Sequence, residues 1–459
     1  MEDGLQAGTP VSEDQHVLWH ILEEHLSEAS FLLEMWERAL FSNDYTPEEL
    51  SSLIESRLTA HLDGLAVGGK VVVEELLLPA LIEAEEPETT TIAALLILYT
   101  CDETLRNHVF ETFRDADPSR QGAMAVAFKL WSDDRASSMY LDQLPSATKE
   151  EELALWLEIL TWQNVSPGAK LAQYLKSSSV ALRSAAIKSA GRFYPAELEQ
   201  YIKQHMSSPN PLLQQAAIET QLIQGDFDGW VKCLELAGAA DCPIRGYYLL
   251  LVALLGSRDD HRIIQAALGD ASHVEGALFA LGFTGSLESA RLCIPHLSSD
   301  NARTAKLAAE AMDGILGFDQ HNDHFQIDEQ ESSKEDDDDE SFPFSEDDLD
   351  ADLIQDGTDD LPLPNPETIV TWWEEHQGRF SPKTRYVAGI PLSPKTFGEI
   401  LRKAPLRRRH PFALELMIRT KARYFVDTMT FLSQQSKDLD RLMSLSEWDF
   451  VNFRHLDNW

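Results

Sequence analysis

Apolar residues recur at three- and four-residue spacing along most of this chain, and short polar turns interrupt them. The pattern is clearest over residues 171–225, where it occurs twice. In each copy an apolar helix ends at Leu175 or Met206, a polar turn follows, and a second helix carries a small residue at Ala185 or Ala216. The two copies are 31 positions apart. Self-similarity at a period of this length indicates an array of helical repeats.

Positions equivalent to Leu175 recur every 29 to 32 residues. These anchors are Ile82, Phe113, Leu144, Leu175, Met206, Leu236, Leu268 and Leu297. Small residues follow most of them by nine to eleven positions: Ala123, Ala154, Ala185, Ala216, Ala277 and Ala308. The copy that begins at Leu236 departs from the rule, with Tyr247 and Tyr248 in the corresponding place. We therefore predict an all-α fold, an α-solenoid of HEAT-like helical hairpins in which stacked copies share one core.

The pattern changes near both ends of the predicted array. Residues 1–70 are expected to form N-terminal capping helices, one over 13–41 and a second that begins at Thr46-Pro47, because proline suits the first position of a helix. The array itself is predicted over 71–320. Residues 321–362 are expected to be an acidic disordered linker, and 363–459 a C-terminal helical module.

Charge separates the last two segments. The chain of 459 residues has a formal net charge of -39, which favours basic protein partners over nucleic acid and anionic membranes. Residues 328–360 hold 17 acidic side chains against Lys334 alone, whereas 379–459 have 15 basic and 8 acidic residues. The densest basic run is Arg402, Lys403, Arg407, Arg408 and Arg409. We expect this run to pair with the acidic linker or with an acidic protein partner.

The cysteines and the hydropathy pattern indicate a cytoplasmic protein. The four cysteines, Cys101, Cys233, Cys242 and Cys293, form no CxxC pair and lie in or beside apolar stretches, so we expect reduced thiols in the core. No signal-peptide pattern opens the chain. No apolar run approaches the ~18 residues that span a bilayer, so no membrane association is expected.

Two local patterns resemble ligand sites, but ordinary helix and turn positions explain them better. Residues 64–71 fit GxxxxGK, but Val71 replaces the Ser or Thr that a phosphate-binding loop requires, and a helical pattern precedes it. His16, His20 and Glu24 share one helix face, yet no other segment supplies a further metal ligand. We therefore predict no metal and no cofactor.

No motif of a catalytic site is present: there is no GxSxG, no HExxH and no dinucleotide-binding fingerprint. Helical repeat arrays mostly bind other proteins, so we predict that the chain is not an enzyme. The candidate partner-binding residues are those at which the repeat or the charge pattern changes, Tyr247, Tyr248 and the run from Arg402 to Arg409.

Three segments together resemble a known family. They are SRLTAHLDGLAVGG, the repeats, and WWEEHQGRFSPKTRYVAGIPLSPKTFGEILRKAPLRRRHPFALELMIRT. They are similar to a poorly characterised family of proteobacterial proteins with HEAT-like repeats, associated with type VI secretion and effector gene clusters. The resemblance implies an accessory adaptor or chaperone whose client is a secretion effector or a spike component. It supplies no catalytic residues.

Two alternatives remain open. An immunity protein that neutralises a toxin would use the same kind of scaffold. A helical-repeat nucleic-acid binder is motivated by the basic run alone, and we favour a protein client over it.

Overall fold

The computed structural model describes residues 17–100, 102–133, 135–193, 198–327 and 357–453. The predicted all-α class is confirmed, since the strands among these residues are two of two residues each. Contacts divide the chain into two compact units. Unit 1 consists of the described residues of Met1–Glu37, Glu48–Thr220 and Asp427–Ser436. Unit 2 consists of those of Arg38–Pro47, Gln221–Val426 and Lys437–Trp459.

Unit 1 contains the first helices of the chain. They are α1 (Trp19–Ala39), α2 (Pro47–Glu49), the π-helix η1 (Leu50–Glu55), α3 (Ser56–Val67), α4 (Gly69–Val72), the π-helix η2 (Val73–Leu77), α5 (Leu78–Glu83), α6 (Pro87–Tyr99), α7 (Glu103–Asp115), α8 (Pro118–Leu130), α9 (Ala136–Gln143), α10 (Glu150–Trp162), the 3-10 helix η3 (Gly168–Lys170), α11 (Leu171–Tyr174), α12 (Val180–Phe193), α13 (Glu199–His205) and α14 (Pro211–Gln224). The last residues of α1 and α14 and the first residue of α2, Pro47, belong to unit 2.

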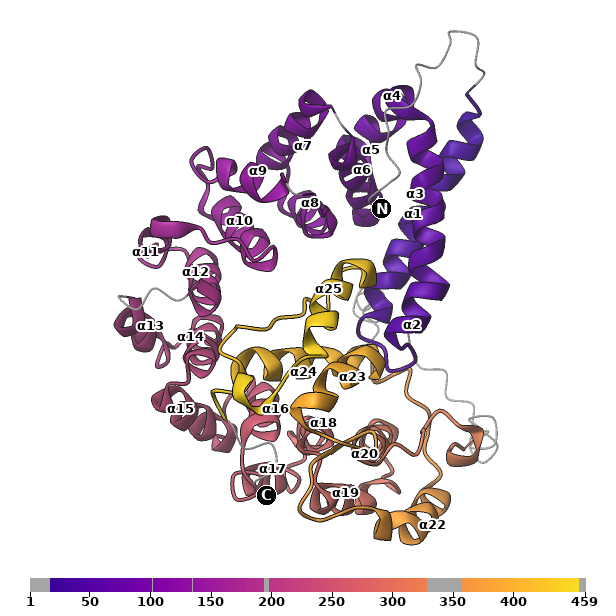
Figure 1. Cartoon of the computed structure of the whole chain (residues 1–459), viewed down its shortest axis with the longest axis vertical. Helices are drawn as coiled ribbons and strands as arrows, with labels where there is room; N and C mark the ends of the chain where they lie inside the picture. Colours follow the sequence, from indigo (N-terminus) through magenta and orange to yellow (C-terminus); the bar gives the residue numbers. More distant parts are fainter. Residues whose placement is uncertain (1–16, 101, 134, 194–197, 328–356, 454–459) are drawn as a thin grey trace, which may run out of the picture. The chain divides into compact units, whose positions relative to one another are not determined.

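The helices of unit 1 form two layers. Helices α6, α8, α10 and α12 pack on one another in succession, and α7, α9 and α11 lie along one side of this row (Figure 1). Helix α8 shows why the boundaries fall where they do. The Asp117 carboxylate accepts hydrogen bonds from the N–H groups of Ser119 and Arg120, and Pro118 occupies the first helical position. The pattern predicted this start.

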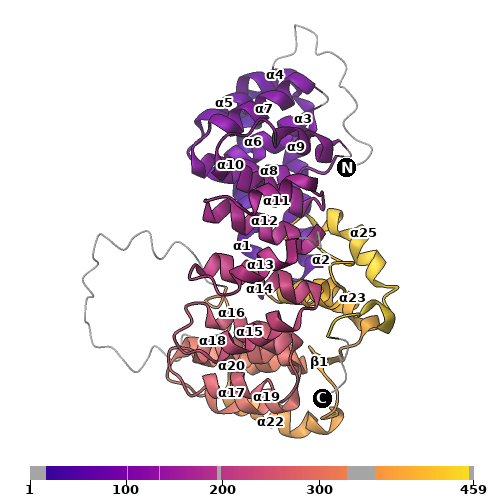
Figure 2. The same ribbon diagram turned by 90° about the vertical axis from the view of Figure 1, so that its left-hand side faces the viewer.

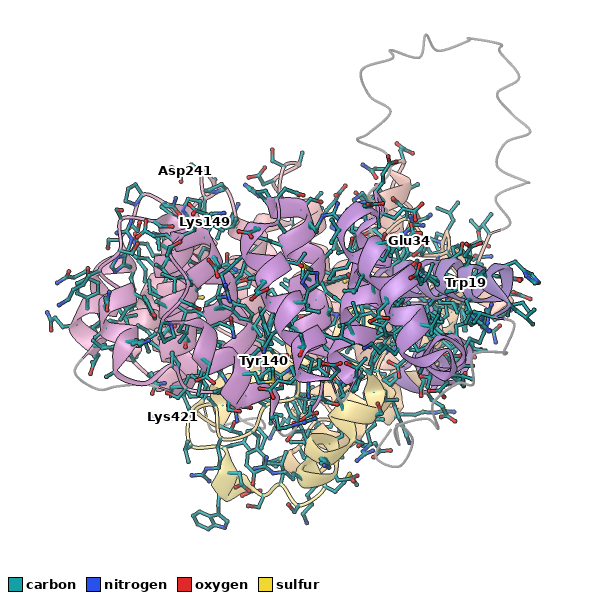
Figure 3. The ribbon with its side chains drawn as sticks, turned by 90° about the horizontal axis from the view of Figure 1, so that it is seen from above. Trp19, Glu34, Tyr140, Lys149, Asp241 and Lys421 are labelled. Atoms are coloured by element: carbon teal, nitrogen blue, oxygen red, sulfur yellow. The ribbon has the colours of Figure 1, made fainter. Side chains whose placement is uncertain are left out.

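An aromatic cluster fills the centre of unit 1. Phe110, Phe113, Phe128, Tyr140 and Trp156 are buried, and their ring centroids lie 4.8–6.3 Å apart along the contacts that join them. Tyr140, labelled in Figure 3, satisfies its hydroxyl by donating to the Phe128 carbonyl oxygen at 2.7 Å. Large rings with a satisfied polar group give a core of high buried area, which stabilises the repeats against one another.

Unit 2 contains the remaining repeats and the C-terminal residues. Its elements are α15 (Phe227–Gly238), α16 (Arg245–Leu255), α17 (Arg262–Ala267), α18 (Val274–Thr284), α19 (Leu287–Cys293), the 3-10 helix η5 (Ile294–His296), α20 (Ala302–Leu316), the 3-10 helix η6 (Asp323–Phe325), α22 (Pro366–His376), the 3-10 helix η7 (Gln377–Arg379), the antiparallel strands β1 (Tyr386–Val387) and β2 (Ile390–Pro391), α23 (Pro394–Lys403), α24 (Leu406–Arg419) and the 3-10 helix η8 (Glu447–Asp449). Helix α25 (Leu432–Leu442) begins in unit 1 and ends in unit 2.

The copy that departs from the alanine rule packs like its neighbours. Helices α16, α18 and α20 follow one another in unit 2 (Figure 2). The close approach of α16 to α18 occurs at Gly246 and Gly276, because a Cβ on Gly276 would lie only 3.3 Å from Gly246 Cα. The small residue of this copy is therefore Gly246, directly before the two tyrosines. The sequence pattern missed it by one position.

Five of the eight predicted anchors are buried, Leu236 and Leu268 are partly exposed, and the assignment of Ile82 is wrong. Phe113, Leu144, Leu175 and Leu297 are in the core, and the six alanines are buried. Ile82 is half exposed, and the preceding Leu81 is the buried residue of that turn. The irregular π-helical turns η1 and η2 precede this copy, and their wider winding shifts the helical register there.

The acidic linker lies largely outside the described residues, which resume at 357. Its described ends are ordered parts of unit 2. The Ile327 N–H donates to the Leu363 carbonyl oxygen at 2.9 Å, and Asn365 N–H donates to Phe325 at 2.7 Å. Thr358 and Leu361 are buried. Residues 363–426 share unit 2 with the last repeats, so the boundary predicted at 362 does not separate two compact units.

Candidate functional site

The predicted basic run divides into a surface pair and three arginines with internal partners. The Arg402 guanidinium lies 2.6 Å from Asp440, and the Lys403 ammonium lies 2.8 Å from Glu399; both basic side chains reach solvent. Exposed pairs of this kind contribute little to stability. Arg402 and Lys403 are therefore the members of the run that a partner can reach.

Arg407, Arg408 and Arg409 form contacts inside unit 2. Arg407 lies 3.4 Å from the buried Glu310 carboxylate and donates to the Thr358 hydroxyl at 3.0 Å. Arg408 donates to the Gly282 carbonyl oxygen, and Arg409 donates to the Leu401 carbonyl oxygen, each at 2.6 Å. Arg408 and Arg409 are buried, so they do not belong to a contact surface. Thr358 lies at the end of the acidic stretch, but its hydroxyl is neutral, and the acidic partners of Arg402, Lys403 and Arg407 lie outside that stretch. The expected charge pairing with the linker falls mostly on residues outside those that the structure describes.

Arg408 lies in a buried environment that changes its pKa. Burial lowers the pKa of its guanidinium, while the neighbouring Glu310 and Asp313 carboxylates oppose that change. The guanidinium carbon lies 4.3 Å from the centroid of the Phe283 ring. A stacked, hydrogen-bonded arginine of this kind fixes the packing of α24 on the repeats.

A second arginine network, which the sequence pattern did not single out, lies beside the first. Glu415 of α24 is fully buried between Arg385 and Arg419. Arg385 Nη2 lies 3.0 Å from Glu415 Oε2, and Arg419 Nε lies 2.7 Å from Glu415 Oε1. One carboxylate thus partners two buried cations, a geometry that stabilises only when the remaining donors are also satisfied.

The remaining donors of this network bind the carboxyl ends of repeat helices. Arg385 donates to the carbonyl oxygens of Leu254 and Phe283, and Arg419 also donates to Leu254. These carbonyls belong to the last turns of α16 and α18, where no intrahelical donor is available and the helix dipole favours cations. The Ala388 N–H in the β1–β2 turn donates to Gly314 of α20 at 2.8 Å. The C-terminal residues of unit 2 therefore close the ends of three successive helices.

Two histidines in unit 2 are buried in the neutral form. Burial and the nearby Arg385 charge lower the pKa of His261 to about 4. Burial also lowers the pKa of His410 to about 4, although its hydrogen bond to the Leu40 carbonyl oxygen opposes the change. A histidine whose folded pKa lies below its unfolded value of 6.5 destabilises the fold as pH decreases, because the unfolded chain binds more protons.

We expect the stability of the wild-type chain to decrease between about pH 6.5 and pH 4, by about 2 kcal/mol per buried histidine near pH ~5. Replacing His410→Gln keeps a donor for Leu40 and removes the titrating group. Urea unfolding of both proteins near pH ~7 and pH ~5 measures the difference. The variant should lose about 2 kcal/mol less than wild type on acidification. Equal losses would contradict the assignment. His273→Gln, at a partly buried histidine whose ring also contacts a backbone carbonyl oxygen, serves as control.

The two predicted tyrosines differ in burial, as the residues of the basic run do. Tyr248 is fully buried in α16, and Tyr247 is partly exposed with its ring centroid 5.7 Å from that of Tyr248. Of the two tyrosines, only Tyr247 can contact a partner.

The cysteines are core residues where described: Cys233, Cys242 and Cys293 are buried and free, and burial raises the pKa of Cys293 to about 12. Cys101 lies outside the described residues.

The two ligand-like patterns lie in the first helices of unit 1 and in the residues before them. Residues 64–71 span the end of α3 and the start of α4, so helix precedes and follows the glycines. His16 lies outside the described residues, and among those described no three His, Cys, Asp or Glu side chains are grouped to hold a metal. None of the described helices combines the length and the apolar character needed to cross a membrane.

Unit 1 contains a surface that sequence reasoning did not identify, formed by Trp36, Glu55 and Leu130 and named here the Trp36 surface. It binds residues 427–436, which are more than 200 positions from the other residues of this unit. The Phe431 ring packs edge-on against Trp36, with centroids 5.2 Å apart. Both rings are buried.

Two hydrogen-bonded contacts of the Trp36 surface lie at helix ends, one at the start of α25 and one at the end of α8. The buried Glu55 carboxylate accepts from Trp36 Nε1 at 3.0 Å and from the Leu432 N–H, the first N–H group of α25, at 3.0 and 3.1 Å. Gln434 Nε2 donates at 2.5 Å to the carbonyl oxygen of Leu130, the last residue of α8. An N–H group at the start of α25 and a carbonyl group at the end of α8, which lack intrahelical partners, are thus both hydrogen-bonded.

Charged groups surround the start of the same segment. Lys129, on α8, lies with its Nζ 2.6 Å from the centroid of the Trp162 ring. Burial lowers the pKa of Lys129 to about 8, and the charges of Asp427, Glu158 and Glu37 oppose the change. Lys129 therefore attracts Asp427, the first residue of the bound segment. Burial raises the pKa of Glu37 to about 7, an effect that Glu88 and Glu34 reinforce and Lys129 opposes; Glu34 is labelled in Figure 3.

Comparisons with known proteins identify no family for this chain. No family model matches it, and no curated protein sequence matches it. Among solved structures, a crystal structure of an engineered protein from a structural genomics consortium covers 63% of this chain and 88% of its own, with 14% identity and a TM-score of 0.29. At this TM-score the likeness carries no argument about fold or function.

Proposed function

We propose that this chain is a non-catalytic, cytoplasmic scaffold that binds a protein client. The Trp36 surface carries the proposal. It already binds a peptide segment through a buried ring contact and through hydrogen bonds to helix-end groups. These are the contacts by which helical proteins bind helical peptides, with an aromatic anchor and satisfied polar groups around it.

In its narrower form, the proposal is that the client is a type VI secretion effector or a spike component, with the chain as adaptor or chaperone. The support for this form is the resemblance of the two ends of the sequence to the proteobacterial HEAT-like family. The acidic net charge of -39 is compatible with a client that carries basic segments.

Nucleic acid is a weaker candidate for the partner. Phosphate recognition needs exposed cations, because affinity arises from the counterions that such contacts release. Within the predicted basic run, Arg408 and Arg409 donate to backbone carbonyl oxygens, and Arg402 and Lys403 are each paired with an acidic side chain. The run therefore offers few free positive charges to a phosphate backbone.

Affinity purification from the native host tests the function. We expect the full chain to recover a specific protein, and a variant with Trp36→Ala to recover at least ~10-fold less of it, because an aromatic anchor typically contributes more than ~1.4 kcal/mol. Lys149→Ala changes an exposed residue of unit 1 that donates to the Arg114 carbonyl oxygen, and it is the matched control. Recovery of no protein, or equal recovery by wild type and Trp36→Ala, would exclude this function at this surface.

A further inference from the structure

We propose that the Trp36 surface is a receptor for the first turn of a partner's helix, and that residues 427–436 occupy it in cis as an autoinhibitory segment. This inference rests on the proposed scaffold function and specifies its partner. The evidence is the chemistry of the groups that the segment presents to Trp36, Glu55 and Leu130.

The contacts of the segment are ones that another helix can reproduce. Glu55 binds a backbone N–H, which every residue except proline has. Trp36 contacts the ring of Phe431, the residue directly before the helix, and the Leu130 carbonyl oxygen receives an amide from Gln434 in the first turn. The surface therefore specifies an aromatic residue before the helix and an amide in its first turn, and otherwise recognises backbone.

Glu55 adds a charge requirement. Helices commonly place Asp or Glu in the first turn, where the helix dipole stabilises them. The first turn of α25 has none. A partner with a carboxylate there would place it beside the buried carboxylate of Glu55, where like charges are unfavourable at low dielectric. The expected partner is an amphipathic helix that follows an aromatic residue and lacks acidic residues in its first turn.

The position of Glu55 indicates that the surface needs an occupant. Glu55 is the last residue of the π-helix η1, and short π-helical turns are frequent at functional sites. With the segment absent, its buried carboxylate would lose the Leu432 N–H, which costs free energy unless another donor replaces it. Exchange of one helix start for another is therefore favoured over simple opening of the surface.

Covalent connection favours the cis segment over a free peptide. Both flanks of residues 427–436 belong to unit 2 and are continuous with the segment, so its effective concentration at the surface is high, on the order of millimolar for short connections. A client must therefore exceed the affinity of the segment, and the wild-type chain should bind a copy of the segment only weakly.

The test uses the full chain and a fluorescent synthetic peptide with the sequence of residues 427–442, followed by anisotropy. Phe431→Ala in the protein removes the cis anchor and leaves Trp36 and Glu55 intact. We expect the peptide to bind this variant at least ~10-fold more tightly than wild type. Two altered peptides are controls: one with Phe431→Ala and one with Ser433→Glu should each lose at least ~10-fold affinity for the variant.

Each result of this titration decides the inference. Equal affinity of wild type and variant would show that the segment does not occlude the surface and would overturn the autoinhibition. Equal binding of the unaltered and Ser433→Glu peptides would overturn the recognition rule. Peptide exchange as expected, together with no protein recovered from the host, would leave this inference intact and contradict the scaffold function.

Discussion

Replacing Glu415→Ala is expected to destabilise unit 2 by about 3–5 kcal/mol, one of the two largest effects that we predict for a single substitution. The carboxylate is fully buried and neutralises Arg385 and Arg419, which are buried as well. Its removal leaves two desolvated cations whose remaining partners are carbonyl oxygens. Loss of one member of a buried ion network costs far more than loss of an exposed pair, because the other charges stay in a low-dielectric environment.

Thermal and urea unfolding of purified protein measure this effect. The matched control is Glu399→Ala, which removes the exposed partner of Lys403 and should change the free energy of unfolding by less than ~0.5 kcal/mol. Glu415→Gln retains an acceptor without the charge, so its destabilisation should lie between those of the other two variants. If Glu415→Ala and Glu399→Ala destabilised the protein equally, the buried network would not be a structural centre of unit 2.

Local signals made the helices predictable. The starts at Pro87, Pro118 and Pro211 follow from the fixed φ and missing N–H of proline, which need no knowledge of the rest of the fold. The buried alanines follow from the repeat period, since every copy solves the same packing problem. Ile82 was misassigned because the π-helical turns before it change the number of residues per turn.

The arginine contacts were not predictable from residue patterns. A run such as Arg407, Arg408 and Arg409 has the same composition whether it faces solvent or the ends of helices. The burial of Arg408 and Arg409 depends on the backbone carbonyl oxygens of Gly282 and Leu401. Every residue has a backbone carbonyl, so residue type does not show which of them accepts a hydrogen bond. The same reason concealed the Trp36 surface, where Glu55 binds an N–H group of a segment that is 377 positions away.

Replacing Gly314→Ala is expected to destabilise unit 2 by about 3 kcal/mol, although alanine is the better helix former. Gly314 is an interior residue of α20, and a Cβ there would overlap the Arg408 guanidinium. Arg408 is buried and hydrogen-bonded to Gly282, so the added methyl group must displace a desolvated cation. Overpacking and loss of that hydrogen bond together exceed the ~1 kcal/mol that alanine contributes as a helix former.

Gly122→Ala is the control for the predicted decrease in stability. Gly122 lies inside α8, and a Cβ there would meet no atom within 4 Å, so only the helix preference acts. This variant should stabilise the protein by about 0.5–1 kcal/mol, and Gly314→Ala should destabilise it, with both measured by urea unfolding at one pH. Stabilisation by both substitutions would show that Arg408 moves aside at little cost. The opposite signs that we expect would establish that α20 lacks a side chain at residue 314 because α24 places its arginine there.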